Sequence, residues 1–261
     1  MSVSVGVNKK CSLDELVRVA QECQSVGIIG ADVLGLKPAM ITTDASSILR
    51  TNDGNECVSR VTSRAGLFCL INALVQGRPG HAAKLLEFLL TALNCNVVPA
   101  FTCNNKASDE LIAFIGGNGM CYSSDKHELI DVSTGLSNAG LTAVSVTPEQ
   151  ASELKSYPFL VIGTGCLAAA AAGNYIRMVD CVAALSCEAS GCNVDAFDAA
   201  NFEVCRPHRG QMQSASNLRL LLDGSKRTNT CSKEAAVLVK SLQTSPQTIG
   251  PCRDIIVAAF K

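Results

Sequence analysis

A short glycine-rich pattern is the first feature of this sequence that could do chemistry. The apolar run Phe159–Ile162 leads into Gly163-Thr-Gly165-Cys-Leu-Ala168, and an Ala-rich segment follows. A G-x-G-x-x-A turn between a strand and a helix is typical of dinucleotide-binding proteins, because its backbone can approach a pyrophosphate. One hypothesis is therefore an NAD(P)-binding protein that uses Gly163 and Gly165. The rest of the chain lacks regular strand–helix alternation, which favours the alternative that these small residues allow close packing.

Fourteen cysteines and three histidines are the other candidates for site chemistry. No C-x-x-C spacing occurs, and the closest cysteine pair, Cys187 and Cys192, lies five residues apart. We therefore expect no metal site, and none is expected at His81, His127 or His208. Most of the cysteines lie in apolar runs and no secretion signal is recognisable, so we expect reduced, structural thiols. His208 is interpreted as a structural histidine in a turn.

Helix signals dominate the elements that would position these groups. Ser12-Leu-Asp-Glu15 is a capping box, and Thr147-Pro148-Glu149 combines an N-cap, a first-turn proline and an acid. Gly77 is a suitable helix stop. The Ala-rich segment from Cys166 to Glu188 is apolar nearly all round, which suits a central helix. One predicted helix begins after Ser12. Further helices are predicted over residues 62–76, 85–98, 147–156, 166–188, 210–222, 233–242 and 253–260, and a short strand is predicted near 39–42.

Composition excludes several classes of protein. Of 261 residues, 48% are hydrophobic and 17% charged, which is enough apolar material for a core. The formal net charge of -1 offers no field for polyanions, so nucleic acid is not an expected partner. The longest apolar stretch, Phe159 to Gly173, is shorter than the ~20 residues of a membrane span. We expect a cytoplasmic protein with no membrane partner.

A longer series of motifs resembles the aromatic amino-acid ammonia-lyases, the family of histidine and phenylalanine ammonia-lyase. Near the start, Gly6-Val-Asn8 is similar to a remnant of the family's Tyr-Gly-Val-Asn segment. The later landmarks occur in the family's order over most of residues 60 to 225. They are Arg64-Ala-x-Leu67, Ile71-Asn-Ala-Leu-Val-Gln-Gly77-x-x-Gly80, Leu93-Asn-x-Asn-Val97-x-Pro99, Ala107-Ser-Asp-Glu-Leu111, Gly163-Thr164, Glu188-Ala189, Phe197-Asp198, Arg206-Pro-His-x-Gly-Gln211 and Asn217-Leu-Arg-x-Leu-Leu-x-Gly-Ser225.

The resemblance implies a specific chemistry. Members of this family cyclise an internal Ala-Ser-Gly into a methylidene-imidazolone, an electrophile that no unmodified side chain offers. The substrate adds to this group, a tyrosine removes a proton, and ammonia leaves. The third position of the triplet is glycine because the strained turn tolerates no Cβ.

The sequence departs from the family at the positions that carry this chemistry. The cofactor triplet is Ala107-Ser108-Asp109, so an aspartate replaces the glycine and should obstruct cyclisation. Val5 occupies the place of the catalytic tyrosine, and Ile162 that of an asparagine that binds substrate and cofactor. Gln243 is the remaining candidate for substrate binding, because the Tyr and Arg segment that follows it in the family has no counterpart here. An intact Ala189-Ser190-Gly191 lies elsewhere, where Gly191 is interpreted as a helix end.

These observations predict an all-α fold: an ammonia-lyase-like helical bundle core, truncated at the C-terminus. We expect a single domain over residues 1–261, with an irregular part over 1–60 and a helical core over 61–261. The resemblance implies a protein that has lost the electrophile and lyase activity and acts as a binding or assembly partner. No cofactor is expected unless Ser108 cyclises, in which case an active, histidine-type ammonia-lyase is the alternative. The apolar helix predicts a homo-oligomer, or a hetero-oligomer with a full-length relative.

Overall fold

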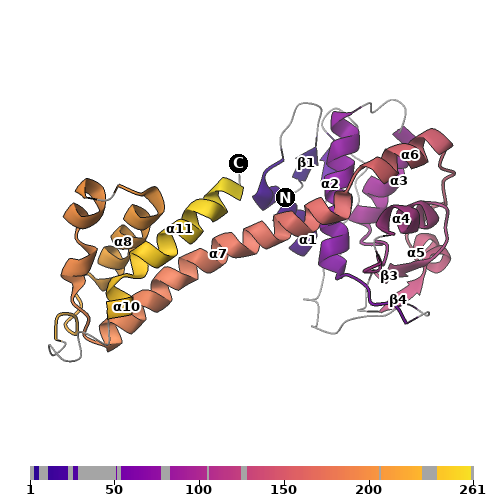
Figure 1. Ribbon diagram of the computed structural model, residues 1–261. Coiled ribbons are helices and arrows are strands. Elements are labelled where there is room, and N and C mark those ends of the chain that lie inside the picture. The colour runs from indigo at the N-terminus through magenta and orange to yellow at the C-terminus, as the bar shows by residue number, and fades with distance from the viewer. Residues whose placement is uncertain are drawn as a thin grey trace. The chain divides into compact units, whose positions relative to one another are not determined.

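The chain forms two compact units, residues 1–168 and 169–261 (Figure 1). The boundary falls inside one continuous helix, α7 (Phe159–Ala189), so a single domain over residues 1–261 stays a prediction. The computed structural model describes residues 3–5, 11–22, 26–28, 51, 54–77, 83–104, 106–124, 128–205, 207–230 and 240–259.

The first unit is mainly helical. Two short strand pairs accompany its helices: β1 (Val3–Val5) pairs in parallel with β2 (Val26–Ile28), and β3 (Met120–Tyr122) pairs antiparallel with β4 (Leu129–Asp131). The helices that precede α7 are α1 (Leu13–Gln21), α2 (Arg60–Gln76), α3 (Ala83–Asn94), α4 (Ala107–Ile115), α5 (Val132–Asn138) and α6 (Pro148–Ser156).

Helix α2 lies at the centre of the first unit's core. Most of its residues are buried, including Phe68, and the core continues through Phe101 and Phe114. Its Arg64 is buried too, because the guanidinium donates hydrogen bonds to backbone carbonyls and to the Asn96 side chain. The Arg64 side chain donates to the Val19 carbonyl at 2.9 Å and to the Leu93 carbonyl at 2.9 Å. One arginine therefore ties the ends of α1 and α3 to α2.

Local capping chemistry explains several helix starts. Ser12 and Glu15 form the predicted capping box of α1, and Thr147 with Gln150 forms another at the start of α6. Helix α6 ends at Ser156 and α2 ends before Gly77, as predicted. These signals are local, which is why the sequence alone could place them.

Some element boundaries were wrong. Helix α7 begins at Phe159 rather than Cys166, since the apolar run before Gly163 is helical and not a strand. Helix α3 ends at Asn94 rather than Val98, because Asn96 adopts a φ of 58° that leaves the helix. The strand expected near 39–42 and residues 233–239 of another expected helix lie outside the described residues.

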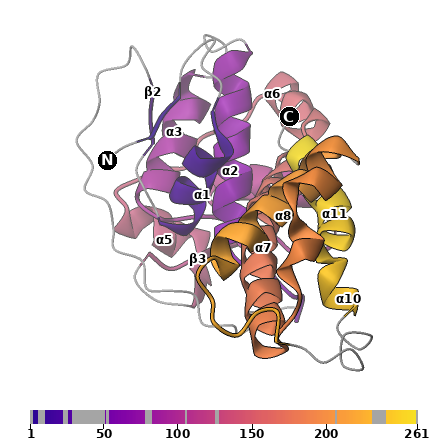
Figure 2. The ribbon, with the colours of Figure 1, turned by 90° about the vertical axis from the view of Figure 1, so that its left-hand side faces the viewer.

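The second unit packs the later part of α7 with helices that follow it. The short helices η2 (Val194–Phe197), η3 (Ala200–Val204) and α10 (Lys240–Gln243) surround the longer pair α8 (Arg209–Leu222) and α11 (Ser245–Ala259). Helices α8 and α11 lie side by side (Figure 2). They approach closely at two glycines, since a Cβ on Gly210 would lie 2.1 Å from the Gly250 carbonyl oxygen.

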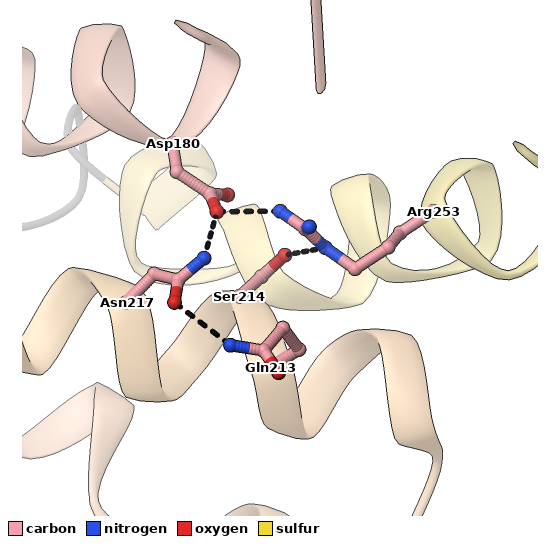
Figure 3. Close-up of polar contacts among 5 residues, drawn as sticks. All are labelled: Asp180, Gln213, Ser214, Asn217 and Arg253. Atoms are coloured by element: carbon pink, nitrogen blue, oxygen red, sulfur yellow. Dashed lines mark hydrogen bonds and ion pairs between the residues drawn. The ribbon is translucent and has the colours of Figure 1, made fainter. Parts of the chain in front are cut away.

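A buried polar network joins α7, α8 and α11 in the second unit (Figure 3). Asp180 of α7 is only 2% exposed, and its Oδ2 lies 2.5 Å from a guanidinium nitrogen of Arg253 in α11. The Asn217 amide of α8 donates to the same oxygen at 2.5 Å. Ser214 accepts a further hydrogen bond from Arg253 at 3.4 Å. The network therefore supplies a counter-charge and two donors to Oδ2 of this buried carboxylate, while Oδ1 is buried without a hydrogen-bond partner.

Helix α7 is less covered than a central helix would be. The segment Pro148–Ala189 is long and apolar enough to span a membrane by length and composition alone, and 17% of its most apolar window is buried. The core helix of a soluble protein can be equally long and apolar, so length and composition alone do not place this segment in a membrane. The helix is longer than the apolar stretch Phe159 to Gly173, because it continues to Ala189.

Candidate functional site

A cavity of about 780 Å³ lies in the first unit where α4, α6 and α7 meet. Most of its wall is apolar, and most of the lining residues come from the end of α6, the linker residues Tyr157 and Pro158, and the first turns of α7. Its polar groups are few and include Ser108, Lys155 and Thr164. An apolar cavity with a few polar groups is the usual form of a small-molecule site.

The triplet Ala107-Ser108-Asp109 forms the first turn of α4 at the edge of this cavity. Ala107 and Ser108 line the cavity, and both are half-buried. Asp109 points to α6, where its carboxylate lies 2.8 Å from the Lys155 ammonium. The two side chains are 63% and 55% exposed, so the ion pair is a surface contact of small energetic value.

The residue after the triplet has a structural role that sequence reasoning missed. Glu110 accepts hydrogen bonds from the Thr102 hydroxyl and, at 2.9 Å, from the Thr102 backbone N–H. Burial raises the pKa of the neighbouring Cys57 thiol, and the negative charge of Glu110 raises this pKa further. Glu110 therefore fixes the start of α4 against the segment around Thr102. The sequence shows an acidic residue, Glu110, three residues after Ala107, but no local pattern indicates that Thr102 is its partner.

The remaining predicted positions are spread over the chain. Ile162 lies in α7 and packs, half-buried, against the first unit's hydrophobic core, and it is not among the residues that line the cavity. Val5 pairs with Ile28 at the end of β1, and its side chain lies outside the described part. Gln243 ends α10 in the second unit. Of the predicted positions, Ala107 and Ser108 line the cavity beside α7, whereas Ile162 does not.

The nucleotide-turn hypothesis for Gly163 and Gly165 was wrong. Both glycines lie within helix α7, whereas a phosphate turn requires a strand before it and a helix after it. A Cβ on Gly163 would lie 2.5 Å from the backbone nitrogen of Gly66 in α2, so this glycine permits close helix packing. Gly165 faces open space. The expectation of close packing was therefore right for Gly163.

The other candidate groups, His208 and Ala189-Ser190-Gly191, lie at helix ends. His208 is the exposed N-cap residue of α8, and its side chain makes no capping hydrogen bond. Gly191 follows the end of α7 with a φ of 62°, and the Cys192 N–H bonds to the Cys187 carbonyl at 2.9 Å. This is the geometry of a helix C-terminus, as predicted for Ala189-Ser190-Gly191. Within the described part of the chain, no group of three or more His, Cys, Asp or Glu side chains is arranged to hold a metal.

Comparison with known proteins identifies the family. A family model described as aromatic amino acid lyase matches residues 22–261. The chain belongs to this family. "Histidine ammonia-lyase 2" of Fusobacterium nucleatum is 30% identical over 199 residues, which are 73% of this chain and 38% of that protein. The chain therefore spans less than half the length of this lyase relative.

Solved structures show the same helical fold. Histidine ammonia-lyase from Trypanosoma cruzi superposes with a TM-score of 0.79 and 18% identity, covering 100% of this chain and 55% of that one. Phenylalanine aminomutase from Pantoea agglomerans superposes with a TM-score of 0.80 and 16% identity, covering 99% and 61%. At such identities the likeness establishes the fold, and the all-α, ammonia-lyase-like prediction is confirmed. A lyase and an aminomutase share this fold, so it does not choose between their reactions.

The residues at the triplet do not fit the methylidene-imidazolone of aromatic amino acid lyases. The ring requires the third residue's amide nitrogen to attack the carbonyl carbon of the first. In α4 the Ala107 carbonyl points along the helix axis toward the N–H of Leu111, as in any helical turn. Asp109 also adds a Cβ and a carboxylate at the position where the ring has a glycine. The arrangement favours an intact helical turn over a cyclised one.

Proposed function

We propose that this chain is an aromatic amino acid lyase family member without the methylidene-imidazolone and without lyase activity. The observation that carries the proposal is Asp109, a branched and charged residue in place of the triplet's glycine, ion-paired to Lys155 at 2.8 Å in a helical turn. The chemistry needs an electrophile, a base and a carboxylate anchor together. Val5 and Ile162, at the base and asparagine positions, carry no group that exchanges a proton or donates a hydrogen bond.

The accurate mass of the intact protein tests this proposal directly. Cyclisation removes two water molecules, so the peptide 107–126, released by trypsin after Lys106 and Lys126, would lose about 36 Da. We expect the mass of the unmodified peptide. A peptide that has lost two waters would overturn the proposal, whatever the activity of the protein.

The exposed face of α7 supports an assembly role. Tyr175, Met178, Val182 and Leu185 are between 59% and 68% exposed, and their spacings of three, four and three residues place them on one stripe. An apolar stripe of this kind is typical of a helix that packs against other helices. We infer that the chain self-associates through this stripe, or joins a longer relative, in the cytoplasm. Light scattering after size-exclusion chromatography tests self-association, which a compact monomer would contradict.

An active, histidine-type ammonia-lyase is the second candidate, because the relative in Fusobacterium nucleatum is named a histidine ammonia-lyase. This candidate requires Ser108 to cyclise despite Asp109, or a site that another chain completes. Incubation with histidine, followed by ultraviolet detection of a conjugated acid product, tests it. A product in the absence of any dehydrated peptide would favour a reaction unlike that of the family.

A further inference from the structure

Helices α2 and α7 cross with their backbones in contact, and each carries a cysteine one turn beyond the crossing. The contact is made by Gly66 and Gly163, where a Cβ on the second would lie 2.5 Å from the nitrogen of the first. Cys69 and Cys166 each follow their glycine by three residues. Residues three apart lie on the same face of a helix, so both thiols face the crossing.

The two cysteines pack on the same hydrophobic core beside the crossing. Cys69 is 8% exposed and belongs to the core, while Cys166 is half-buried and packs against the same core. Burial raises the pKa of Cys69 to about 12, and the charge and hydrogen bond of the Cys166 side chain raise it further. Burial raises the pKa of Tyr157, and both thiols raise it further.

We propose that Cys69 and Cys166 form a reversible disulfide that fixes the first turns of α7 to α2. Because the two backbones touch at Gly66 and Gly163, thiols one turn beyond on the facing sides need only a short approach to reach the S–S length of about 2.05 Å. The partially exposed Cys166 is the thiol that a reagent can reach. Cys69, which is buried behind it, is positioned to complete the bond. Cys11 lies near Cys69 but donates its thiol to Asn72 Oδ1 at 3.5 Å.

The oxidant is a small disulfide of the glutathione class. The Cys166 thiolate attacks one sulfur of the small disulfide, which forms a mixed disulfide and releases one small thiol. The Cys69 sulfur then gives up its proton and attacks the Cys166 sulfur, which releases the second small thiol. Two protein thiols are oxidised, one small disulfide is reduced, and both protons end on the released thiols.

The position of the bond gives it a structural consequence. The first turns of α7, from Phe159 to Gly165, form one wall of the cavity beside Ser108. Oxidation would hold this wall against α2, and reduction would release it. The bond also closes a long loop of the chain, which restricts the unfolded state strongly. The oxidised protein should therefore be the more stable form.

The test compares the protein after equilibration with reduced or oxidised glutathione. After alkylation of the remaining thiols, trypsin releases Cys69 in the peptide 65–84 and Cys166 in the peptide 156–177, each with a single cysteine. We expect these two peptides to be linked in the oxidised sample, and the melting temperature to rise by roughly 5–10 °C. The link and the rise should disappear when a dithiol reductant is added.

Two substitutions separate this bond from other thiol oxidation. Cys166→Ser and Cys166→Ala should both abolish the linked peptide and the rise in melting temperature. Cys181→Ser, at an exposed cysteine of the same helix, should leave both unchanged. The proposal is overturned if oxidised wild-type protein contains only glutathione adducts at these positions. A rise in melting temperature that persists in both Cys166 variants would overturn it as well.

Discussion

Gly163 and Gly165 lie two residues apart in α7, but their surroundings differ. Gly163 lies where the α2 backbone touches the helix, so the absence of a Cβ permits the crossing. Gly165 has no neighbour within 4 Å of the position that a Cβ would take. The same residue type is therefore a packing requirement at one position and a cost in helix propensity at the other.

These environments predict opposite effects of the same substitution. Gly163→Ala should lower the free energy of unfolding by about 1–3 kcal/mol, because the methyl group would meet backbone atoms that cannot move aside. Gly165→Ala should raise it by roughly 0.5–1 kcal/mol, since alanine is the better helix former. Urea unfolding of the two variants measures both values. Equal effects would contradict the helix crossing as described.

The helices of the second unit are held by a buried ion pair, whereas another pair there lies at the surface. Asp180 and Arg253 are 2% and 13% exposed, and they connect α7 to α11. Arg219 and Glu203 lie 3.3 Å apart but are 33% and 51% exposed. Burial decides how much each pair contributes, because an exposed pair is screened by solvent.

Removing one arginine from each pair should separate the two cases. Arg253→Ala leaves the Asp180 carboxylate buried without its counter-charge, and should cost about 3–5 kcal/mol of unfolding free energy. Arg219→Ala should cost about 1 kcal/mol or less. Thermal or urea unfolding of matched variants checks the difference. Similar costs for both would mean that the Asp180 network is solvated.

Local signals explain which elements could be predicted from the sequence. The caps at Ser12 and Thr147 depend on neighbouring residues only, so both helix starts were predicted. Helix α4 was missed although its acidic first turn and apolar Leu111 and Phe114 have helical spacing. The ion pair of Asp109 with Lys155 joins residues far apart in the chain, and no local pattern indicates it. The triplet was found only because the chain resembles a family.

Buried thiols throughout the molecule should make the free energy of unfolding fall as pH rises in the alkaline range. Burial raises the pKa of Cys69, Cys121 and Cys187 to about 12 each, whereas an unfolded thiol titrates near about 8.5. The folded chain keeps these protons longer, so the stabilisation is complete below about 8.5 and is lost as pH rises toward 12. Urea midpoints at pH 7, 9 and 10 should therefore fall. Cys187→Ser should make the fall shallower, while Cys252→Ser, at an exposed thiol, should not.

The proposed self-association through the exposed apolar stripe of α7 can be tested by substituting one residue of that stripe. Val182 lies at the middle of the exposed apolar stripe, so Val182→Glu places a charge where the proposed interface would exclude water. The variant should elute with the mass of one chain while the wild type elutes as an oligomer. Arg177→Glu, on the same helix but outside the stripe, is the matched control and should leave the oligomer intact. An unchanged mass for Val182→Glu would place the interface elsewhere, because a single buried carboxylate costs more than one helix contact provides.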